Sequence, residues 1–297
     1  MLEIQWRAVA MTWLNVIILA VVQGLAELLP VSSSAHVVVA EKLLGLDPSS
    51  PPMTLLLVML HTGTMFAVIV YFWKQWMQTY FKSLEAFKAI AWRVVVATVL
   101  TVAVGGLIVK GVEHLVLDKA DIENLFSHLE FIAPALAVAG VLILWSGLRE
   151  KRAGVRNGAG EPEALTLQRA GIIGVVQGLC VPFRGLSRSG ATISTGMLLG
   201  VSKQQAEAFS FALAVVLTPP VVGREVLRLM HAAHESGGAA LSSVAALCVF
   251  GAVVAFVAGL AALRWLSRWL ESGRWYLFGI YCLCAAVAVA VLYGRGY

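Results

Sequence analysis

The sequence predicts an all-α polytopic membrane protein built from two related halves. Of its 297 residues, 59% are hydrophobic and only 13% are charged, whereas a soluble domain carries about 25% charged residues. Six apolar stretches are long enough, with their flanking residues, to cross the hydrocarbon core of a bilayer. A polar motif that occurs twice along the chain indicates the division into halves.

The six predicted spans are separated by polar connections. They are Met53–Trp73, Val94–Val109, Phe131–Trp145, Ala208–Val222, Ala240–Leu263 and Trp275–Tyr293. A further apolar segment near the N-terminus, Val16–Val22, runs directly into a polar motif and has no small-residue cleavage site. We therefore do not expect it to be a cleaved signal peptide.

The duplicated motif has an offset of 154 residues. Val21–Leu25 (VVQGL) returns as Val175–Leu179, and the two segments end in LLG at Gly45 and Gly200. Each copy holds a short apolar arm, a break rich in Pro, Ser or Gly, and a second short arm. This pattern is typical of a re-entrant helical hairpin, and irregular backbone at membrane depth must be surrounded by protein or line a cavity. We expect both hairpins to lie inside the ring of spans.

Each half then consists of one hairpin and three transmembrane helices. Because three is an odd number, the second half must cross the membrane in the opposite sense to the first. We predict one membrane domain over residues 1–297, with repeat 1 at about 1–150, a cytoplasmic linker at about 151–163 and repeat 2 at about 164–297. Inverted repeats place their binding site near the midplane, where the broken segments meet.

The basic residues set the orientation and account for the net charge of +5. Thirteen of the 22 Lys and Arg fall in four places: 74–93, 149–169, 264–274 and Lys203. By the positive-inside rule these connections are cytoplasmic. The acidic segment Lys110–Glu130 and both termini are then external. This distribution leaves no basic surface for nucleic acid, and we expect no nucleic-acid partner.

Four ionisable residues lie within the two breaks, while we place the other charges at or near span ends. They are Glu27, His36, Arg184 and Arg188. An ionisable side chain inside a membrane segment costs a few kcal/mol and marks a functional site by default. The breaks, rather than the spans, are therefore expected to carry the chemistry.

The second break is suited to phosphate. Arg188 stands among hydroxyl and glycine residues in the segment Leu186–Thr192, where a helical arm is expected to begin. An arginine fork and free N–H groups at a helix start both bind phosphate oxygens. The residues available for this binding are Arg184, Ser187, Arg188, Ser189, Gly190 and Thr192. The alternative is that Arg188 only pairs with Glu27 to hold the hairpins together.

The first break offers a nucleophile and a base. In Pro30–His36 (PVSSSAH), His36 follows Ser33 by one helical turn, and a serine nucleophile needs a base within hydrogen-bond reach. Ser32 and Ser34 can donate to phosphate, although helix capping is the alternative for any of the three serines.

Glu27 has two possible roles in this first break. It follows Gln23 by four residues and therefore shares its helix face. Its carboxylate is expected to act as a general base, or as a ligand for a divalent cation that also binds the substrate. A single carboxylate suits Mg²⁺ or Ca²⁺ better than a closed zinc site.

Both breaks resemble the signatures of the BacA-type undecaprenyl-diphosphate phosphatase family. Gln23–Glu27 with Pro30–His36 is similar to the first signature, and Gly185–Thr192 to the second. The tracts Leu60–Thr64 and Phe209–Leu217 are also similar, so the resemblance covers nearly the whole chain. It implies hydrolysis of a C55 isoprenoid diphosphate at the outer face of the bacterial cytoplasmic membrane, with a divalent cation.

Carried onto this sequence, the resemblance implies a catalytic group of Glu27, Ser33, His36 and Arg188. Ser33 would either form a phospho-enzyme or only orient the attacking water. Gln23, Ser32 and Ser34, together with the residues of the second break, would contact the phosphates. The membrane lipids and the isoprenoid diphosphate are the expected partners. Recycling of the lipid carrier would serve cell-wall synthesis.

Two positions depart from the signatures. Ala35 stands where the family has Gly, which is expected to stiffen a turn, and Arg184 stands where it has Pro. A transporter or flippase of a lipid phosphate or small anion remains the alternative, because inverted repeats with broken helices are common among transporters. A carrier would need Arg188 but not the pair of Ser33 and His36.

Overall fold

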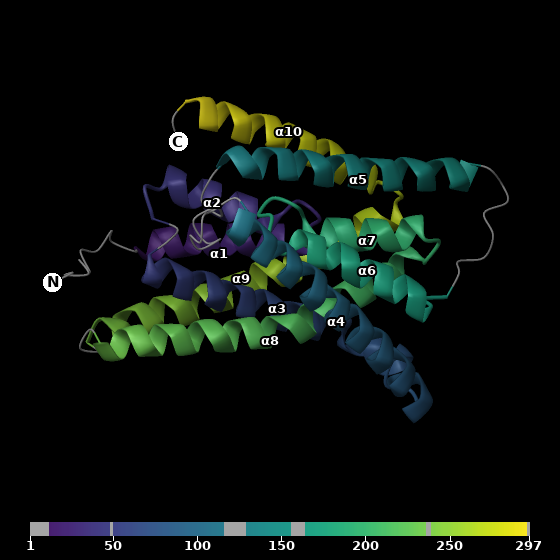
Figure 1. The fold of residues 1–297 in the computed structure, drawn as a ribbon, viewed down its shortest axis with the longest axis horizontal. Helices are drawn as coiled ribbons and strands as arrows, with labels where there is room; N and C mark the ends of the chain where they lie inside the picture. The colour runs from purple at the N-terminus through teal and green to yellow at the C-terminus, as the bar shows by residue number, and fades with distance from the viewer. Residues whose placement is uncertain (1–11, 48–49, 116–128, 156–163, 236–238, 296–297) are drawn as a thin grey trace.

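The computed structural model describes residues 12–47, 50–115, 129–155, 164–235 and 239–295 as helices and short connections, without a β-strand among them (Figure 1). The helices in chain order are α1 (Trp13–Leu28), α2 (Ser33–Leu43), α3 (Pro51–Thr79), α4 (Leu84–Leu115), α5 (Leu129–Val155), α6 (Leu167–Cys180), α7 (Arg188–Leu198), α8 (Lys203–Glu235), α9 (Ala239–Glu271) and α10 (Tyr276–Gly294).

Six of these helices are long and apolar enough to cross a membrane: α3, α4, α5, α8, α9 and α10. They contain the six predicted spans, except that Trp275 precedes the first residue of α10, so the prediction of a polytopic all-α protein is confirmed. The other four helices form two pairs, α1 with α2 and α6 with α7, of 11 to 16 residues each. None of the four reaches the roughly 20 residues that a span requires, as the two interrupted motifs predicted.

The helices α1–α5 and α6–α10 repeat one order, two short helices followed by three long ones. In Figure 1, α1 begins at the left end of the molecule and α6 begins at the right end. Helices of one half also pack against helices of the other. In the first half α4 lies against α6 of the second half, and its counterpart in the second half, α9, lies against α1 of the first half. Two further pairs join equivalent helices, α3 with α8 and α5 with α10.

A glycine in each copy of the repeated motif permits these contacts. A Cβ atom on Gly24 would lie 2.6 Å from the Cβ of Ala258 and 2.8 Å from the carbonyl oxygen of Ala255, both in α9. A Cβ atom on Gly178 would lie 2.9 Å from the carbonyl oxygen of Thr101 in α4. These distances are too short for any real side chain, so the backbones of α1 and α6 approach the long helices only because the motif holds glycine there.

Trp275 anchors the second hairpin. Its ring is fully buried, and its indole N–H lies 3.1 Å from the hydroxyls of both Ser146 in α5 and Ser194 in α7. Because a buried indole N–H needs an acceptor, this shared bond fixes α7 against two long helices. The start of α7, which carries Arg188, is thereby held in place.

The turn in the first hairpin differs from the expectation for Ala35. Ala35 lies inside α2 and is buried, so it occupies no turn that would favour glycine. The left-handed position is Ser32, with φ of 69°, and it is the sole non-glycine residue with positive φ in the described part of the chain. In the second hairpin Gly185 has φ of +107°, a conformation that glycine adopts without strain.

Some predicted features fall partly outside the described residues. The acidic segment Lys110–Glu130 includes residues 116–128, and the linker includes 156–163, neither of which the structure describes. Residues 1–11 and 296–297 at the termini also lie outside it.

We predict that alanine at Gly24 or Gly178 destabilises the protein, whereas alanine at Gly106 in α4 does not. A Cβ atom at Gly106 would meet nothing within 4 Å, which makes that position a matched control. Overpacking a tight contact costs about 1–3 kcal/mol. Thermal unfolding of the purified variants in detergent measures the difference, and equal melting temperatures for all three would show that the close helix approach is unimportant.

Candidate active site

The tips of the two hairpins meet at an ion pair. Glu27 is next to the last residue of α1 and Arg188 is the first residue of α7. An Nη atom of Arg188 lies 2.6 Å from Oε1 of Glu27, and the two side chains are 26% and 12% exposed. The structure therefore brings together two residues that are 161 positions apart in the chain, as the sequence predicted.

Three further side chains contact the second carboxylate oxygen of Glu27, Oε2. The Ser33 hydroxyl donates a short hydrogen bond to Oε2, and the amide of Gln23 donates to the same atom at 3.1 Å. Nε2 of His61, from α3, lies 3.4 Å from it. A carboxylate that already accepts a serine hydroxyl is placed to remove its proton when the serine oxygen attacks.

The tight turn between α1 and α2 presents Ser33 to this carboxylate. Ser33 is the first residue of α2, and Ser32 before it has φ of 69° and ψ of 89°. A left-handed conformation costs a non-glycine residue about 1–2 kcal/mol, and such strain is concentrated at functional sites. Ser32 makes no side-chain capping bond, so the predicted capping role does not explain this serine.

One nitrogen of the Arg188 guanidinium is available to donate to a ligand. While one Nη atom contacts Glu27, the other, Nη1, is buried and has no hydrogen-bond partner among the described residues. A guanidinium binds phosphate through two parallel N–H donors. The unsatisfied nitrogen is the observation that points most directly to an anionic ligand here.

The neighbours of Arg188 mainly build the start of α7. The Ser187 hydroxyl caps the helix by accepting from the amide of Gly190 at 3.1 Å. The Thr192 hydroxyl lies 2.8 Å from the carbonyl oxygen of Arg188 and 2.6 Å from the hydroxyl of Ser210 in α8. Ser189 reaches across to the first hairpin, with its hydroxyl 3.4 Å from the carbonyl oxygen of Leu29. These contacts hold the arginine in place, while phosphate binding by the same residues stays a prediction.

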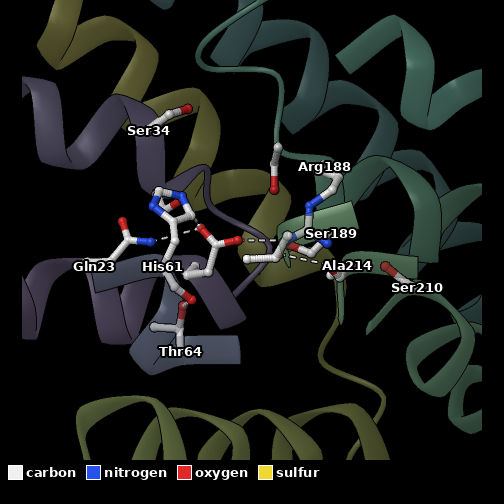
Figure 2. Close-up of polar contacts among 12 residues, drawn as sticks. Gln23, Ser34, His61, Thr64, Arg188, Ser189, Ser210 and Ala214 are labelled. Carbon is white, nitrogen blue, oxygen red and sulfur yellow. Dashed lines mark hydrogen bonds and ion pairs between the residues drawn. The ribbon is translucent and has the colours of Figure 1, made fainter. Parts of the chain in front are cut away.

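Ser34 and Arg184, two other predicted phosphate ligands, have contacts of their own. Ser34 is half-buried with its hydroxyl 3.4 Å from that of Ser32, and Figure 2 shows it apart from the arginine. Arg184 is half-buried and interacts electrostatically with the buried carboxylate of Glu41 in α2. The part of these residues in phosphate binding stays a prediction.

His36 faces away from Ser33. Its Nδ1–H donates to the carbonyl oxygen of Ser32 at 2.7 Å, and its Nε2 lies 2.7 Å from the hydroxyl of Tyr281 in α10. The two rings are stacked, with centroids 5.6 Å apart. The expected base for Ser33 is therefore occupied elsewhere in this conformation, and the Glu27 carboxylate takes the serine hydroxyl in its place.

A cavity next to the ion pair contains residues that the sequence analysis missed. Its polar walls are Glu27, His61, Thr64, Arg188 and Thr218, and its apolar walls come from α1, α3 and α8. His61 lies in the middle of a span, contrary to the expectation that charges outside the breaks stand near span ends. The sequence signal that could have identified His61 was the presence of an ionisable residue within the predicted span Met53–Trp73.

The residues fit a divalent cation only if the substrate completes its ligands. Within the described part of the chain, no three His, Cys, Asp or Glu side chains gather as a metal site. Glu27 supplies one carboxylate, which is compatible with Mg²⁺ or Ca²⁺ held chiefly by phosphate oxygens and water. A closed metal cage is not formed by these residues.

These features define a class: a polytopic helical membrane protein whose two hairpin tips bring a serine hydroxyl and an arginine against one carboxylate. The chain belongs to the BacA family, because residues 16–288 match the family described as bacitracin resistance protein BacA.

Three relatives illustrate the similarity. Undecaprenyl-diphosphatase 2 of Acinetobacter baylyi is 56% identical, covering 95% of this chain and 99% of that protein. Undecaprenyl-diphosphatase of Acidiphilium cryptum is 35% identical over 92% of this chain and 95% of its own length. The Mycolicibacterium smegmatis undecaprenyl-diphosphatase is 34% identical, with coverage of 96% and 98%.

We predict strong coupling between Glu27 and Arg188 in folding stability. Removing one partner of a buried ion pair leaves the other charge uncompensated and costs about 3–5 kcal/mol, whereas replacing both costs less. Because these side chains are 26% and 12% exposed, we expect a cost below that range here. Glu27→Gln and Arg188→Gln should each lower the melting temperature more than the double variant does. A double-mutant cycle by thermal unfolding in detergent measures this coupling, and strictly additive effects would contradict it.

Proposed function

We propose that this protein is a phosphatase that hydrolyses undecaprenyl diphosphate to the monophosphate and inorganic phosphate. The observation that carries the proposal is the Ser33 hydroxyl donating to Glu27 beside the arginine of the other hairpin. The names of the relatives, which cover nearly the full chain, support the same substrate. Release of the lipid monophosphate would return the carrier to cell-wall synthesis.

The proposed reaction has two steps. Ser33 Oγ attacks the terminal phosphorus while Glu27 accepts the hydroxyl proton, and the bond between that phosphorus and the bridging oxygen breaks. The lipid monophosphate leaves with the bond electrons. Water then attacks the phosphoserine and gives its proton to His36, the bond between phosphorus and the serine oxygen breaks, inorganic phosphate is released, and the serine oxygen takes back the proton held by Glu27. Throughout, Arg188 stabilises the charge on the phosphate oxygens, which is the main requirement of phosphoryl transfer.

His36 and the metal have supporting roles in this proposal. His36 would shuttle a proton after rotating away from Tyr281, since its present partners are Ser32 and that tyrosine. A divalent cation shared by Glu27 and the diphosphate would neutralise phosphate charge when bound. We expect EDTA to lower the activity and Mg²⁺ or Ca²⁺ to restore it.

The proposed architecture is a pair of inverted repeats in the bacterial cytoplasmic membrane, with the site open to the outer face. Three observations support the inversion: α1 and α6 begin at opposite ends of the molecule, α4 and α9 exchange partners, and the glycine contacts repeat at 154 residues. The connection from α3 to α4 and the start of α6 lie at one end in Figure 1. These are the segments with the basic residues that the positive-inside rule assigns to the cytoplasm.

A transporter or flippase of a lipid phosphate is the second candidate. Two broken hairpins meeting inside a ring of spans would suit a carrier. The hydrogen bond from Ser33 to Glu27 favours the enzyme, because a carrier has no need of a serine aimed at a base.

We predict that Ser33→Ala abolishes phosphate release from C55 diphosphate but leaves lipid binding nearly intact. Glu27→Gln and Arg188→Ala should lower the rate by about 10²–10³-fold, because each removes one electrostatic partner of the transition state. Phosphate release and lipid binding are measured in parallel on the purified proteins in detergent, with and without EDTA.

Ser83→Ala provides the matched control, since this exposed serine lies in the connection between α3 and α4. Wild-type rates for both Ser33→Ala and Glu27→Gln would overturn the assignment of the catalytic group. A wild-type protein that binds the lipid without ever releasing phosphate would favour the carrier.

We predict that residue 83 faces the cytoplasm and residue 295 the outside. Single cysteines at the exposed positions Ser83 and Arg295, in a chain whose exposed Cys284 is replaced by Ser, report the orientation. A membrane-impermeant thiol reagent applied to intact cells should label only position 295. Labelling of position 83 alone would reverse the orientation.

A further inference from the structure

We propose that Tyr281 of α10 acts, through His36, as a positioning residue for Ser33. Its hydroxyl holds the imidazole ring that in turn holds the strained turn in front of this serine. The inference rests on the proposed function and deepens it, because Tyr281 lies outside every tract that resembles the family signatures. Tyr281 and His36 are 245 positions apart, so the turn of the first hairpin would depend on the last helix of the second half.

A chain of two short hydrogen bonds links Tyr281 to this turn. The Tyr281 hydroxyl lies 2.7 Å from Nε2 of His36, and Nδ1 of the same ring lies 2.7 Å from the carbonyl oxygen of Ser32. A carbonyl oxygen only accepts hydrogen bonds, so Nδ1 carries a proton. In the neutral ring Nε2 accepts from the tyrosine, and in the cationic ring it donates to the tyrosine oxygen. Both bonds are therefore made in either protonation state.

The carbonyl group of Ser32 is the point at which the chain meets the turn. It also accepts from the backbone N–H of His36 at 3.3 Å, so two donors of one residue hold it. Ser32 is in the left-handed conformation, with φ of 69°, and such a conformation persists only where the surroundings impose it. The next residue, Ser33, donates its hydroxyl to Glu27. Because the two serines are adjacent, a shift of the Ser32 carbonyl would move that hydroxyl away from the carboxylate.

Helix α10 contacts the same turn at a second point. Cys282, the residue after Tyr281, is buried, and its thiol lies 3.5 Å from the carbonyl oxygen of Pro30. The ring of Tyr281 also stacks on that of His36, with the two planes 13° apart. Two neighbouring residues of α10 therefore support the connection between α1 and α2. Because stacking needs only the ring, the contribution of the hydroxyl can be tested separately.

The test removes this hydroxyl and keeps the ring, with Tyr281→Phe. Formation of the lipid monophosphate from C55 diphosphate is measured in a single turnover with enzyme in excess, which reports the attack by Ser33. The rotation of His36 belongs to the second step of the proposed reaction and does not enter this rate. We expect the maximal rate to fall by about 2- to 10-fold, the effect of one neutral hydrogen bond. The enzyme concentration that gives the half-maximal rate should not change, since Tyr281 is not among the residues that line the cavity.

Tyr293→Phe is the matched control. Tyr293 also belongs to α10, and its hydroxyl donates to Oε2 of Glu130 in α5 at 2.8 Å. This variant loses the same hydroxyl and one hydrogen bond to another helix, but it should leave the single-turnover rate unaltered. Melting temperatures of both variants show whether each protein is folded.

A second measurement needs no substrate. In protein with isotope-labelled histidines, nuclear magnetic resonance detects the Nδ1–H proton of His36, which is identified by its loss in His36→Gln. This proton should exchange with water faster in Tyr281→Phe than in the wild type, because the ring has lost one of its two bonds. The exchange should be unchanged in Tyr293→Phe. If the tyrosine ring acted by packing alone, Tyr281→Phe would leave the exchange unaltered as well.

An unchanged or faster single turnover in a folded Tyr281→Phe protein would overturn the proposal, since the hydroxyl would then be dispensable or would only restrain His36. Unchanged exchange of the Nδ1–H proton, or weaker apparent affinity at an unchanged maximal rate, would also contradict it. The wild-type phosphate-release assay is a separate outcome. If that assay fails, the proposed function falls, whereas the exchange measurement still decides whether Tyr281 holds the ring of His36.

Discussion

The ion pair between Glu27 and Arg188 is the interaction on which the rest of the site depends. It joins the end of α1 to the start of α7, so it exists only when the two hairpins meet tip to tip. The same carboxylate that pairs with the arginine also accepts the Ser33 hydroxyl. In the proposed reaction, this one pair would set both where a phosphate binds and which oxygen attacks it.

The hairpins do not depend on this pair alone to hold them together. A buried ion pair contributes little net stability, because desolvation opposes the attraction. The close contacts of Gly24 with α9 and of Gly178 with α4 are better placed to hold the hairpins, as is the buried Trp275 bonded to Ser146 and Ser194. The packing of the long helices thus maintains a charged centre that stays available to an anionic ligand.

The extent to which sequence predicted this arrangement differs between the scaffold and the site. The spans and broken hairpins follow from apolar length and from the repeat, and Glu27 and Arg188 stand out as ionisable residues in the breaks. The orientation of the His36 ring could not be predicted from the sequence, because it is set by the contact of α2 with Tyr281 of α10. His61 stood out as an ionisable residue in a predicted span and lies in the family-like tract Leu60–Thr64, but one histidine in a 29-residue apolar helix gives no indication of which residue it contacts. Only the packing of α1 beside α3 brings it to Glu27.

The close packing of α1 on α9 has a consequence for how the protein is made. Gly24 contacts residues 255–259, which are synthesised more than 200 residues later. At about 5–20 residues per second, this delay is on the order of 10–40 s. Throughout that interval the first hairpin has no α9 to pack against, and until Arg188 is made, 161 residues after Glu27, it also lacks the partner that neutralises this carboxylate. The polar tip of the first hairpin is therefore complete only after most of the second half has been made.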